Sequence, residues 1–320
     1  MALASENEFL AMVDDIFPAA HDHMELGRGD DCAVLRCPSR LCLTTDAFLE
    51  DVHFRRAYFT PEEAGRKALL VNVSDLAGMG AQPLGFSLDL LIPPGLPDDW
   101  WRRALEGMRD VAVEAGMALV GGDLSVAAQV GFCVTAWGGP WAERALARGQ
   151  ARPGDTLFAV GPLGLARAGL LALERMGRED AEADSPEAVC HHLSPPLLLQ
   201  ASRRLSAIPG VRGLMDVSDG LARDVPRFLA PETGALIDLS PDALHPEVRR
   251  AAAGAGDKAP LFAYLGGEDY ALLGACAPAA REAAQSAGAC ILGVVTDSPG
   301  VILLNEEPAP VRGFDHFEED

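Results

Sequence analysis

The sequence predicts a mixed α/β protein of the α+β class that is built from two domains. Strand-like and helix-like stretches alternate in both halves of the chain, which is typical of sheets covered by helices. The chain has 320 residues, enough for two ordinary domains. Between residues 138 and 154 the composition shifts to Gly, Pro and Arg before the alternation starts again. We therefore expect one domain at residues 1-148 and a second at residues 149-320.

In the first half, the stretch from Leu41 to Thr45 has the pattern of a strand that ends at Asp46. The sequence Thr60-Pro61-Glu62-Glu63 combines an N-cap threonine, a proline at the first helical position and a glutamate at N3. It predicts a helix that runs toward Gly78 or Gly80. The other elements expected in this half are strands at residues 85–92, 117–120 and 129–137, and a helix at 97–115 that Gly116 closes.

The second half begins with a strand expected at residues 156–160 and a helix at 165–176. Further on, we expect a helix near 196–208, a strand at 214–217, a helix after Gly220, and strands near Leu236, Ile291 and Val301. The segment from Arg178 to Pro186 is rich in acidic and small residues and is predicted to be a solvated loop.

Charge and composition exclude several classes of function. With 26 basic and 47 acidic residues the formal charge is -21, which argues against binding to a nucleic-acid backbone. The two lysines are Lys67 and Lys258, so phosphate chemistry would depend on arginine, backbone amides or metal ions. The seven cysteines include no Cys-x-x-Cys pair that would indicate a zinc site. There is neither an apolar run long enough for a membrane nor a secretory signal pattern, so we expect a cytoplasmic protein.

Aspartates at the ends of buried-looking stretches are the most informative residues. Gly, Ser or Thr residues within a few positions allow tight turns there; the aspartates are Asp30, Asp31, Asp46, Asp75, Asp123, Asp216 and Asp219. Any one of them alone is an ordinary turn or cap residue. Together they suggest converging carboxylates, which would repel one another unless Mg²⁺ or Ca²⁺ held them. Since Mg²⁺ prefers few carboxylates together with phosphates, the pattern predicts a nucleoside triphosphate site.

The common nucleotide and hydrolase motifs are missing. There is no Gly-x-x-x-x-Gly-Lys-Ser/Thr, and Gly27-Arg28-Gly29 lacks the third glycine of a dinucleotide fingerprint. Gly161 to Gly164 links a strand to a helix, so its amides either face an anion or only pack. His-Glu-x-x-His and Gly-x-Ser-x-Gly are also absent, which leaves zinc protease and serine hydrolase chemistry without support.

Eight segments in order resemble the thiamine-monophosphate kinase family, within the ATP-binding superfamily of aminoimidazole ribonucleotide synthetase and selenophosphate synthetase. The most distinctive is Val71-Asn72-Val73-Ser74-Asp75-Leu76-Ala77-Gly78-Met79-Gly80-Ala81. The others are Gly27 to Val34, Thr44 to Asp46 with Glu50 to Phe54, Leu119 to Asp123, Arg148 with Pro153 to Asp155, Met215 to Leu221, Gly266 to Tyr270, and Gly313 to Phe317.

The resemblance implies transfer of the γ-phosphate of ATP to thiamine monophosphate. It implies Mg²⁺ at Asp30, Thr44, Thr45, Asp46, Asp75, Asp123, Asp216 and Asp219, of which Asp46, Asp75 and Asp219 would be the catalytic residues. It also implies ATP contacts at Gly122, Asp123, Arg148 and Ser218, and a thiamine phosphate pocket at His53, Glu268 and Phe314. The implied fold is like that of aminoimidazole ribonucleotide synthetase: an N-terminal sheet forms the interface of a homodimer, and a C-terminal α/β domain completes the nucleotide and substrate cleft.

Three departures from the family pattern and two alternatives remain open. Arg28 stands where the family has a small or aliphatic residue between the two glycines, and Pro226 is expected to kink or shorten the helix after Asp219. Leu124-Ser125-Val126 stands where the family usually has a Thr-Thr or Thr-Ser pair followed by arginine, and Arg28 is a candidate to replace that arginine at the ATP phosphates. The first alternative function is another ATP-dependent kinase or synthetase of the superfamily that acts on a different acceptor. The second, from another class, is a non-catalytic acidic metal-binding or scaffold protein.

Overall fold

The computed structural model describes residues 5–310 and divides the chain into two compact units. Unit 1 comprises Met1–Leu76 and Ala81–Pro140, and unit 2 comprises Ala77–Gly80 and Trp141–Asp320. The break after Pro140 lies inside the stretch rich in Gly, Pro and Arg. Both units combine helices and strands, which confirms the predicted mixed α/β class.

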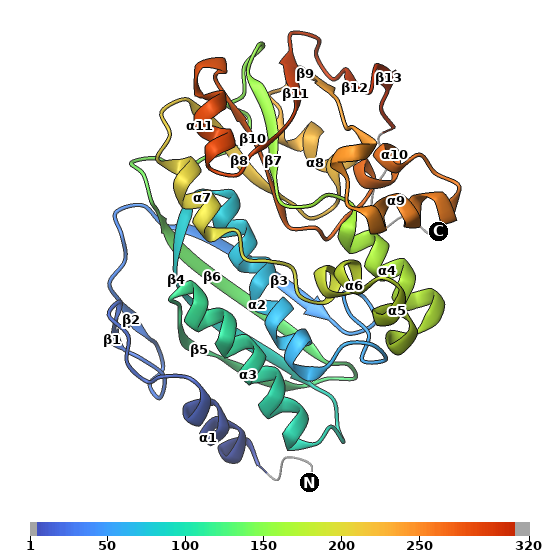
Figure 1. Cartoon of the computed structure of the whole chain (residues 1–320). Coiled ribbons are helices and arrows are strands. Elements are labelled where there is room, and N and C mark those ends of the chain that lie inside the picture. The colour runs from blue at the N-terminus through green and yellow to red at the C-terminus, as the bar shows by residue number, and fades with distance from the viewer. Residues whose placement is uncertain (1–4, 311–320) are drawn as a thin grey trace. The chain divides into compact units, whose positions relative to one another are not determined.

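Unit 1 is built on a four-stranded sheet with the strand order β3-β6-β4-β5 (Figure 1). Strands β4 and β5 are parallel and are joined through helix α3, whereas the other neighbours are antiparallel. The elements of this unit are α1 (Glu6–Ile16), β1 (Met24–Leu26), β2 (Val34–Leu35), β3 (Cys42–Leu49), α2 (Pro61–Gly78), β4 (Ala81–Ile92), α3 (Asp98–Ala115), β5 (Ala118–Val126) and β6 (Gly131–Pro140).

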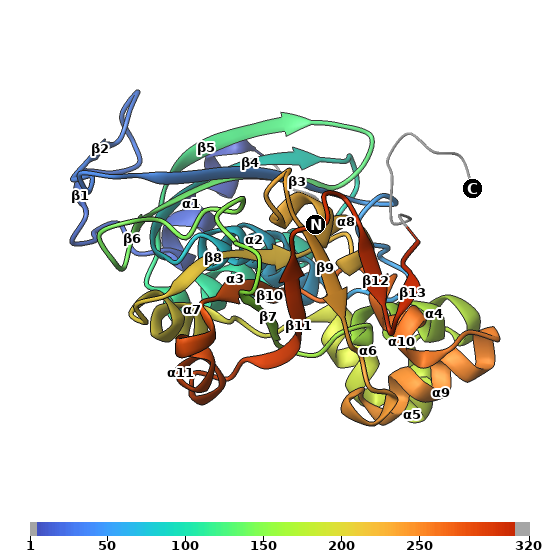
Figure 2. The same cartoon turned by 90° about the horizontal axis from the view of Figure 1, so that it is seen from above.

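Helices α2 and α3 cover one face of this sheet, as Figures 1 and 2 show from two sides. The layer between them buries large apolar side chains completely, among them Trp101, Phe86 and Phe132. The two helices approach closely at glycines: a Cβ on Gly65 would lie 1.8 Å from the carbonyl oxygen of Ala104. This packing holds the N-terminal part of α2 close against α3.

The predicted start of α2 is confirmed by its capping box. The backbone N–H of Thr60 donates to Glu63 Oε2 at 2.8 Å, and the N–H of Glu63 donates to Thr60 Oγ1 at 3.3 Å. Gly116 ends α3 in the left-handed conformation, as expected. Strands of unit 1 extend beyond their predicted bounds: β4 begins at Ala81 and β6 ends at Pro140. Strand β3 continues to Leu49 and β5 to Val126, so Asp46 and Asp123 lie inside strands rather than at their ends. Both are edge strands, in which polar residues are common, so the pattern of apolar residues does not show where such a strand ends.

Unit 2 contains a seven-stranded sheet in the order β13-β12-β9-β11-β7-β10-β8, antiparallel except for the pair β12 and β9. Its elements are β7 (Thr156–Val160), α4 (Leu165–Met176), α5 (Arg178–Asp184), α6 (Pro186–Leu193), α7 (Leu199–Ser206), β8 (Val211–Val217), α8 (Leu221–Phe228), β9 (Gly234–Ile237), η1 (Pro241–Ala243), α9 (Pro246–Ala255), α10 (Ala259–Tyr264), β10 (Ala271–Cys276), η2 (Pro278–Ala280), α11 (Arg281–Ser286), β11 (Cys290–Thr296), β12 (Ile302–Leu304) and β13 (Glu307–Pro308).

Strand β7 shows how the core of unit 2 is divided between the two faces of its sheet. Leu157 and Ala159 belong to one apolar cluster, and Phe158 and Val160 belong to the other. All five residues of the strand are buried. A strand covered on both faces reads as a continuous apolar run, which is why the sequence pattern located it correctly.

The prediction of a solvated loop between Arg178 and Pro186 is wrong, because residues Arg178–Asp184 form helix α5. Ala181 is fully buried, and Arg178 Nε donates to Glu182 Oε1 one turn later at 2.8 Å. Acidic residues in the first turn also suit the positive end of the helix dipole. The acidic composition therefore reflects a helix N-terminus and not a loop. Across residues 5–310, we find no helix that combines the length and the apolar character needed to span a membrane.

Candidate functional site

In unit 1, strand β3 and helix α2 bring three of the expected metal ligands together. Thr44 Oγ1 donates a hydrogen bond to Asp75 Oδ2. Asp46, two residues along β3, points to the same face of the sheet and is hydrogen-bonded to Asp75. The register explains this convergence: Asp46 is paired with the buried Val134, on the face that α2 covers.

The electrostatics of this cluster suit a divalent cation. Burial of its carboxyl, together with the charge of Asp75 and the hydrogen bond to it, raises the pKa of Asp46 to about 6. Asp46 as a whole residue is exposed, so the desolvation acts locally on the carboxyl group. Two carboxylates and a hydroxyl oxygen are hard ligands, and Mg²⁺ typically takes one or two carboxylates and completes its coordination with water and phosphate. The residues present therefore fit Mg²⁺.

Thr45 and Asp123 lie on the opposite face of the same sheet. Thr45 is paired with Thr135, whose hydroxyl is 3.1 Å from that of Thr45. Asp123 is paired with Asp89 and accepts a hydrogen bond from Ser125 Oγ at 2.8 Å. Gly122 has a φ of 155°, and a Cβ there would lie 1.8 Å from the carbonyl oxygen of Leu88. Six of the expected Mg²⁺ ligands belong to unit 1. They are thus divided between the two faces of its sheet and its N-terminal loop.

Asp30 lies on that exposed loop after β1, where its Oδ1 accepts from the N–H of Asp31 at 2.8 Å. The neighbouring Arg28, a candidate phosphate ligand, makes several contacts within the protein. Its guanidinium donates to Asp14 Oδ1 and to the carbonyl oxygens of Phe17, at 2.9 Å, and Leu119, at 2.8 Å. Arg28 therefore ties the β1 region to α1 and β5.

His53 has two contacts of a structural kind. Its Nδ1 accepts from the N–H of Leu49 at 3.0 Å, and its ring stacks on that of Phe48 with centroids 5.8 Å apart. The first contact requires an unprotonated Nδ1, which fixes the orientation of the ring. Phe314, the aromatic residue expected in the same pocket, lies outside the described residues.

In unit 2, the end of β8 and the segment Gly266 to Tyr270 run side by side. The N–H of Glu268 donates to the carbonyl oxygen of Ser218 at 2.7 Å, and the N–H of Tyr270 donates to that of Val217 at 2.9 Å. A Cβ on Gly267 would lie 2.8 Å from the carbonyl oxygen of Ser218, so only glycine permits this approach. The structure thus brings Ser218 and Asp219, expected at ATP and metal, beside Glu268. Asp216 is buried within β8, just before them.

Asp219 has two partners on helix α8 that the sequence analysis did not identify. Arg227 Nη1 forms an ion pair with Asp219 Oδ2 and lies 3.4 Å from Asp224 Oδ1. The side chain of Asp224 is fully buried and accepts from the N–H of Asp219 at 3.0 Å. Burial, together with the charge of Asp219, raises the pKa of Asp224 to about 6. The spacing Asp-Gly-Leu-x-x-Asp was the available signal, because it places a carboxylate at the first turn of the helix.

Arg148 is exposed and lies near the other end of α8. The following residue, Gly149, donates its N–H to the carbonyl oxygen of Phe228 at 2.8 Å. Since α8 has eight residues, its ends are separated by about 12 Å. Arg148 and Asp219 are therefore placed at opposite ends of one short helix.

The anion that faces the turn from Gly161 to Gly164 belongs to the protein itself. Asp269 accepts hydrogen bonds from the N–H groups of Gly164 and Ala166, at the start of α4. Burial raises the pKa of Asp269 to about 7, although these hydrogen bonds act in the opposite direction. The amides of Gly164 and Ala166 are thus occupied by a carboxylate of the protein. Asp269 was recognised only as part of the Gly266 to Tyr270 segment, with no role of its own.

The carboxylates do not form a complete cage by themselves. Among the residues that the structure describes, no group of three or more His, Cys, Asp or Glu side chains is arranged to hold a metal ion. A cation at Asp46 and Asp75 would therefore need further ligands, as expected for an ion that also binds phosphate oxygens.

Family comparisons cover both units. Residues 29–139 match the family described as AIR synthase related protein, N-terminal domain, and residues 152–304 match its C-terminal domain. The thiamine-monophosphate kinase of Synechococcus elongatus is 33% identical over 308 residues, which are 91% of this chain and 91% of the relative. The resemblance expected from the sequence segments is thereby confirmed.

Two solved structures have the same fold. A thiamine-monophosphate kinase from Stenotrophomonas maltophilia is 29% identical, with a TM-score of 0.80 over 97% of this chain and 99% of its own. AaThiL complexed with AMPPCP and TMP is 26% identical, with a TM-score of 0.77 over 98% of this chain and 97% of its own. These matches span both units.

Proposed function

The chain belongs to the thiamine-monophosphate kinase family, and on this premise we propose that it transfers the γ-phosphate of ATP to the phosphate of thiamine monophosphate. The products are thiamine diphosphate and ADP. The observation that carries this function is the similarity to relatives of that name across both units, at 33% identity over 91% of the chain. The relative complexed with AMPPCP and TMP supports the same pair of ligands.

We assign Mg²⁺ binding first to Asp46 and Asp75. Thr44, on strand β3, donates a hydrogen bond to Asp75 on helix α2 and is assigned to the same site. The convergence of these residues and the raised pKa of Asp46 support this assignment. The remaining assignments follow the family pattern: Mg²⁺ at Asp30, Thr45, Asp123, Asp216 and Asp219; ATP at Gly122, Asp123, Arg148 and Ser218; and thiamine monophosphate at His53, Glu268 and Phe314. Bound Mg²⁺ would neutralise the repulsion between the donor and acceptor phosphates.

No protein nucleophile is required, because the acceptor is a phosphate oxygen that is ionised near neutral pH. The chain's own residues have to hold the two anions in line and exclude water, which is the general requirement for phosphoryl transfer. Asp46 and Asp75 are held by a strand and a helix, and Glu268 by a backbone pairing with Ser218. Such rigid placement supports direct in-line transfer.

We also propose that unit 1 forms a homodimer through the sheet face that α2 and α3 do not cover. This face carries Leu43, which is 64% exposed. It also carries Trp137, which is paired with Leu43 on the neighbouring strand β6 and lies over Gly85. Thr45 and Thr135 make the middle of this face polar, whereas the exposed Leu43 beside Trp137 makes one end apolar, and such an apolar end favours a second copy as its occupant. Leu43→Lys should convert the dimer to a monomer in analytical ultracentrifugation, whereas an unchanged mass would contradict this interface. The cytoplasmic location expected from the sequence stays a prediction.

The decisive test is to incubate the purified protein with ATP, Mg²⁺ and thiamine monophosphate and to follow thiamine diphosphate by chromatography. Asp75→Asn and Asp219→Asn should abolish turnover and leave the fold intact. The matched controls are Asp110→Asn and Asp242→Asn, two exposed aspartates on other surfaces, which should retain activity. Full activity of both site variants would overturn the metal assignments.

The same preparation separates the alternatives left open by the sequence. An enzyme of the superfamily with a different acceptor would bind ATP in isothermal titration but would form no thiamine diphosphate, because its own acceptor is absent from the assay. A non-catalytic scaffold would show no heat of binding for ATP at millimolar Mg²⁺ in isothermal titration.

A further inference from the structure

Two neighbouring histidines of helix α6 are buried beside two neighbouring acidic residues of unit 2. His191 and His192 are 7% and 2% exposed. His192 Nδ1 lies 3.3 Å from Glu268 Oε2, and His191 Nε2 lies 3.1 Å from the carbonyl oxygen of Asp269. His191 Nε2 also lies 3.8 Å from Asp269 Oδ1, so each histidine is close to a carboxylate, and His191 contacts the main chain in addition.

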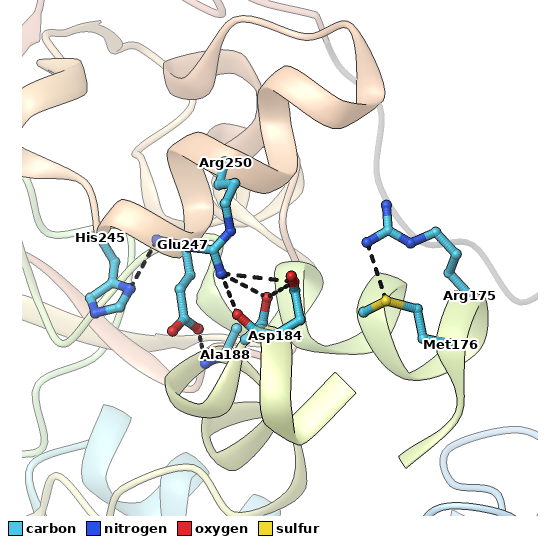
Figure 3. A network of polar contacts seen from close by, with 8 residues as sticks. Arg175, Met176, Asp184, Ala188, His245, Glu247 and Arg250 are labelled. Carbon is cyan, nitrogen blue, oxygen red and sulfur yellow. Dashed lines mark hydrogen bonds and ion pairs between the residues drawn. The ribbon is translucent and has the colours of Figure 1, made fainter. Parts of the chain in front are cut away.

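Helix α6 is held rigidly in place. A Cβ on Gly169 of α4 would lie 2.1 Å from the carbonyl oxygen of Ala188 and 3.0 Å from Cβ of His192, so the two helices are in close contact. At the start of α6, the buried Glu247 of α9 accepts from the N–H of Ala188 at 2.7 Å (Figure 3). Arg250, also shown there, donates to the carbonyl oxygen of Asp184 at 2.6 Å. The His192 ring therefore projects from a fixed support.

Glu268 has the features of a functional residue held under strain. Its φ of 63° lies in the left-handed region, which costs a non-glycine residue about 1 kcal/mol or more. Its backbone is held there by the hydrogen bond to Ser218, while its side chain stays 29% exposed. The carboxylate is therefore accessible to a ligand on one side and contacts a buried imidazole on the other.

We infer that His192 is a positioning residue, which orients the Glu268 carboxylate for thiamine monophosphate. The inference rests on the proposed function, in which Glu268 contacts that substrate. The contact of His192 Nδ1 with Glu268 Oε2 restricts the rotamers of the Glu268 side chain before the substrate binds. Without this contact, the side chain would lose its rotational freedom on binding, at a cost in affinity. His192 acts through Glu268 alone and does not touch the substrate, so its effect should be confined to one of the two substrates.

The test compares substitutions of His192 that differ in where a donor is placed. Asn puts its amide near the position of Nδ1, Gln puts it near that of Nε2, and Leu has none. We expect His192→Leu and His192→Gln to raise the KM for thiamine monophosphate roughly tenfold, because the ring nitrogen that contacts Glu268 Oε2 at 3.3 Å is removed or displaced. The KM for ATP should stay within about twofold, and His192→Asn should restore the wild-type value. If the Leu variant does not fold, the contrast between Asn and Gln remains decisive.

A double-mutant cycle separates positioning from general stability. In a Glu268→Ala background, His192→Leu should cause no further rise in the KM for thiamine monophosphate. The matched control is His191→Leu, on the same buried helix, which should lower Tm without a selective change in that KM. Equal effects on both substrates, or a tenfold effect that persists without Glu268, would overturn the inference. If Glu268→Ala leaves the KM for thiamine monophosphate unchanged, the proposed role of Glu268 is wrong. If Glu268→Ala raises this KM but His192→Leu does not, the positioning role of His192 is wrong and the role of Glu268 stands.

Discussion

Asp75 on helix α2 accepts a hydrogen bond from Thr44 on strand β3, and Asp46 of the same strand is hydrogen-bonded to the same carboxyl group. The two elements follow one another in the chain, with Thr44 and Asp75 31 positions apart, and they meet because α2 packs on the sheet. The carboxylates are therefore brought together by folding itself, before any ligand binds. In the metal-free protein, the proximity of these two carboxyl groups lowers the folding stability as they ionise, and this effect can be measured.

The stability of the metal-free protein should fall as the pH rises through the titration of Asp46. The pKa of Asp46 is raised from 3.8 to about 6, so the folded state holds the proton more tightly than the unfolded state. The contribution to stability is full below 3.8 and is lost as the pH passes about 6. Thermal melts in EDTA should show a decline between about pH 4 and pH 7 that is smaller in Asp46→Asn. Parallel curves for the two proteins would rule this out.

Glycine at position 268 should give a more stable protein than alanine. Both substitutions remove the carboxylate, but only glycine adopts a φ of 63° without strain. We expect Glu268→Gly to exceed Glu268→Ala by about 1 kcal/mol in the free energy of unfolding, measured by urea titration. Both variants should lose affinity for thiamine monophosphate to the same extent. A more stable alanine variant would show that the left-handed conformation is relaxed in solution.

The close packing of α2 against α3 should not tolerate a methyl group at Gly65. A Cβ would approach the carbonyl oxygen of Ala104 to 1.8 Å, so the helices would have to separate. We expect Gly65→Ala to destabilise the protein by about 3 kcal/mol. Gly254→Ala is the matched control, since nothing lies within 4 Å of its Cβ position in helix α9, and it should stabilise by about 0.5 kcal/mol. Differential scanning calorimetry measures both, and similar Tm values for the two variants would argue against the close contact.

Removal of the Asp269 carboxylate should destabilise helix α4. Two buried N–H groups, of Gly164 and Ala166, would lose their acceptor. We expect Asp269→Ala to cost about 1 to 3 kcal/mol in unfolding free energy. Glu179→Ala, an exposed carboxylate in the first turn of α5, should change stability by less than about 0.5 kcal/mol. Hydrogen exchange of the α4 amides would locate the effect, and unchanged protection there would refute the capping role.

The sequence predicted those elements whose signals are local. The capping box at Thr60 and Glu63, the helix end at Gly116 and the buried strand β7 depend on neighbouring residues and were located closely. The strands β3 and β5 were drawn too short, because Asp46 and Asp123 are polar residues inside strands and interrupt the apolar pattern. Burial of Ala181 in α5 depends on packing between helices, which no local pattern reports.

The candidate site could be anticipated as residue types but not as an arrangement. That Thr44 and Thr45 point to opposite faces follows from strand alternation, yet which face α2 covers is set by tertiary packing. The contacts of His192 with Glu268 and of Asp269 with Gly164 join residues 76 and 105 positions apart. The contacts of Arg28 with Asp14 and with carbonyl oxygens could not be anticipated either, because they depend on how α1 and β5 pack around it.

The last residues of α2 and the turn after it belong to unit 2, although the rest of that helix belongs to unit 1. Ala77 accepts from Ser202 Oγ at 2.6 Å, Met79 accepts from the N–H of Leu146 at 2.9 Å, and Gly80 accepts from the N–H of Trp141 at 3.0 Å. A fragment that starts at Trp141 would expose these donors and the cavity left by Ala77. The C-terminal half therefore cannot be excised as an autonomous module, and gene truncations or fusions at residue 141 should yield insoluble product.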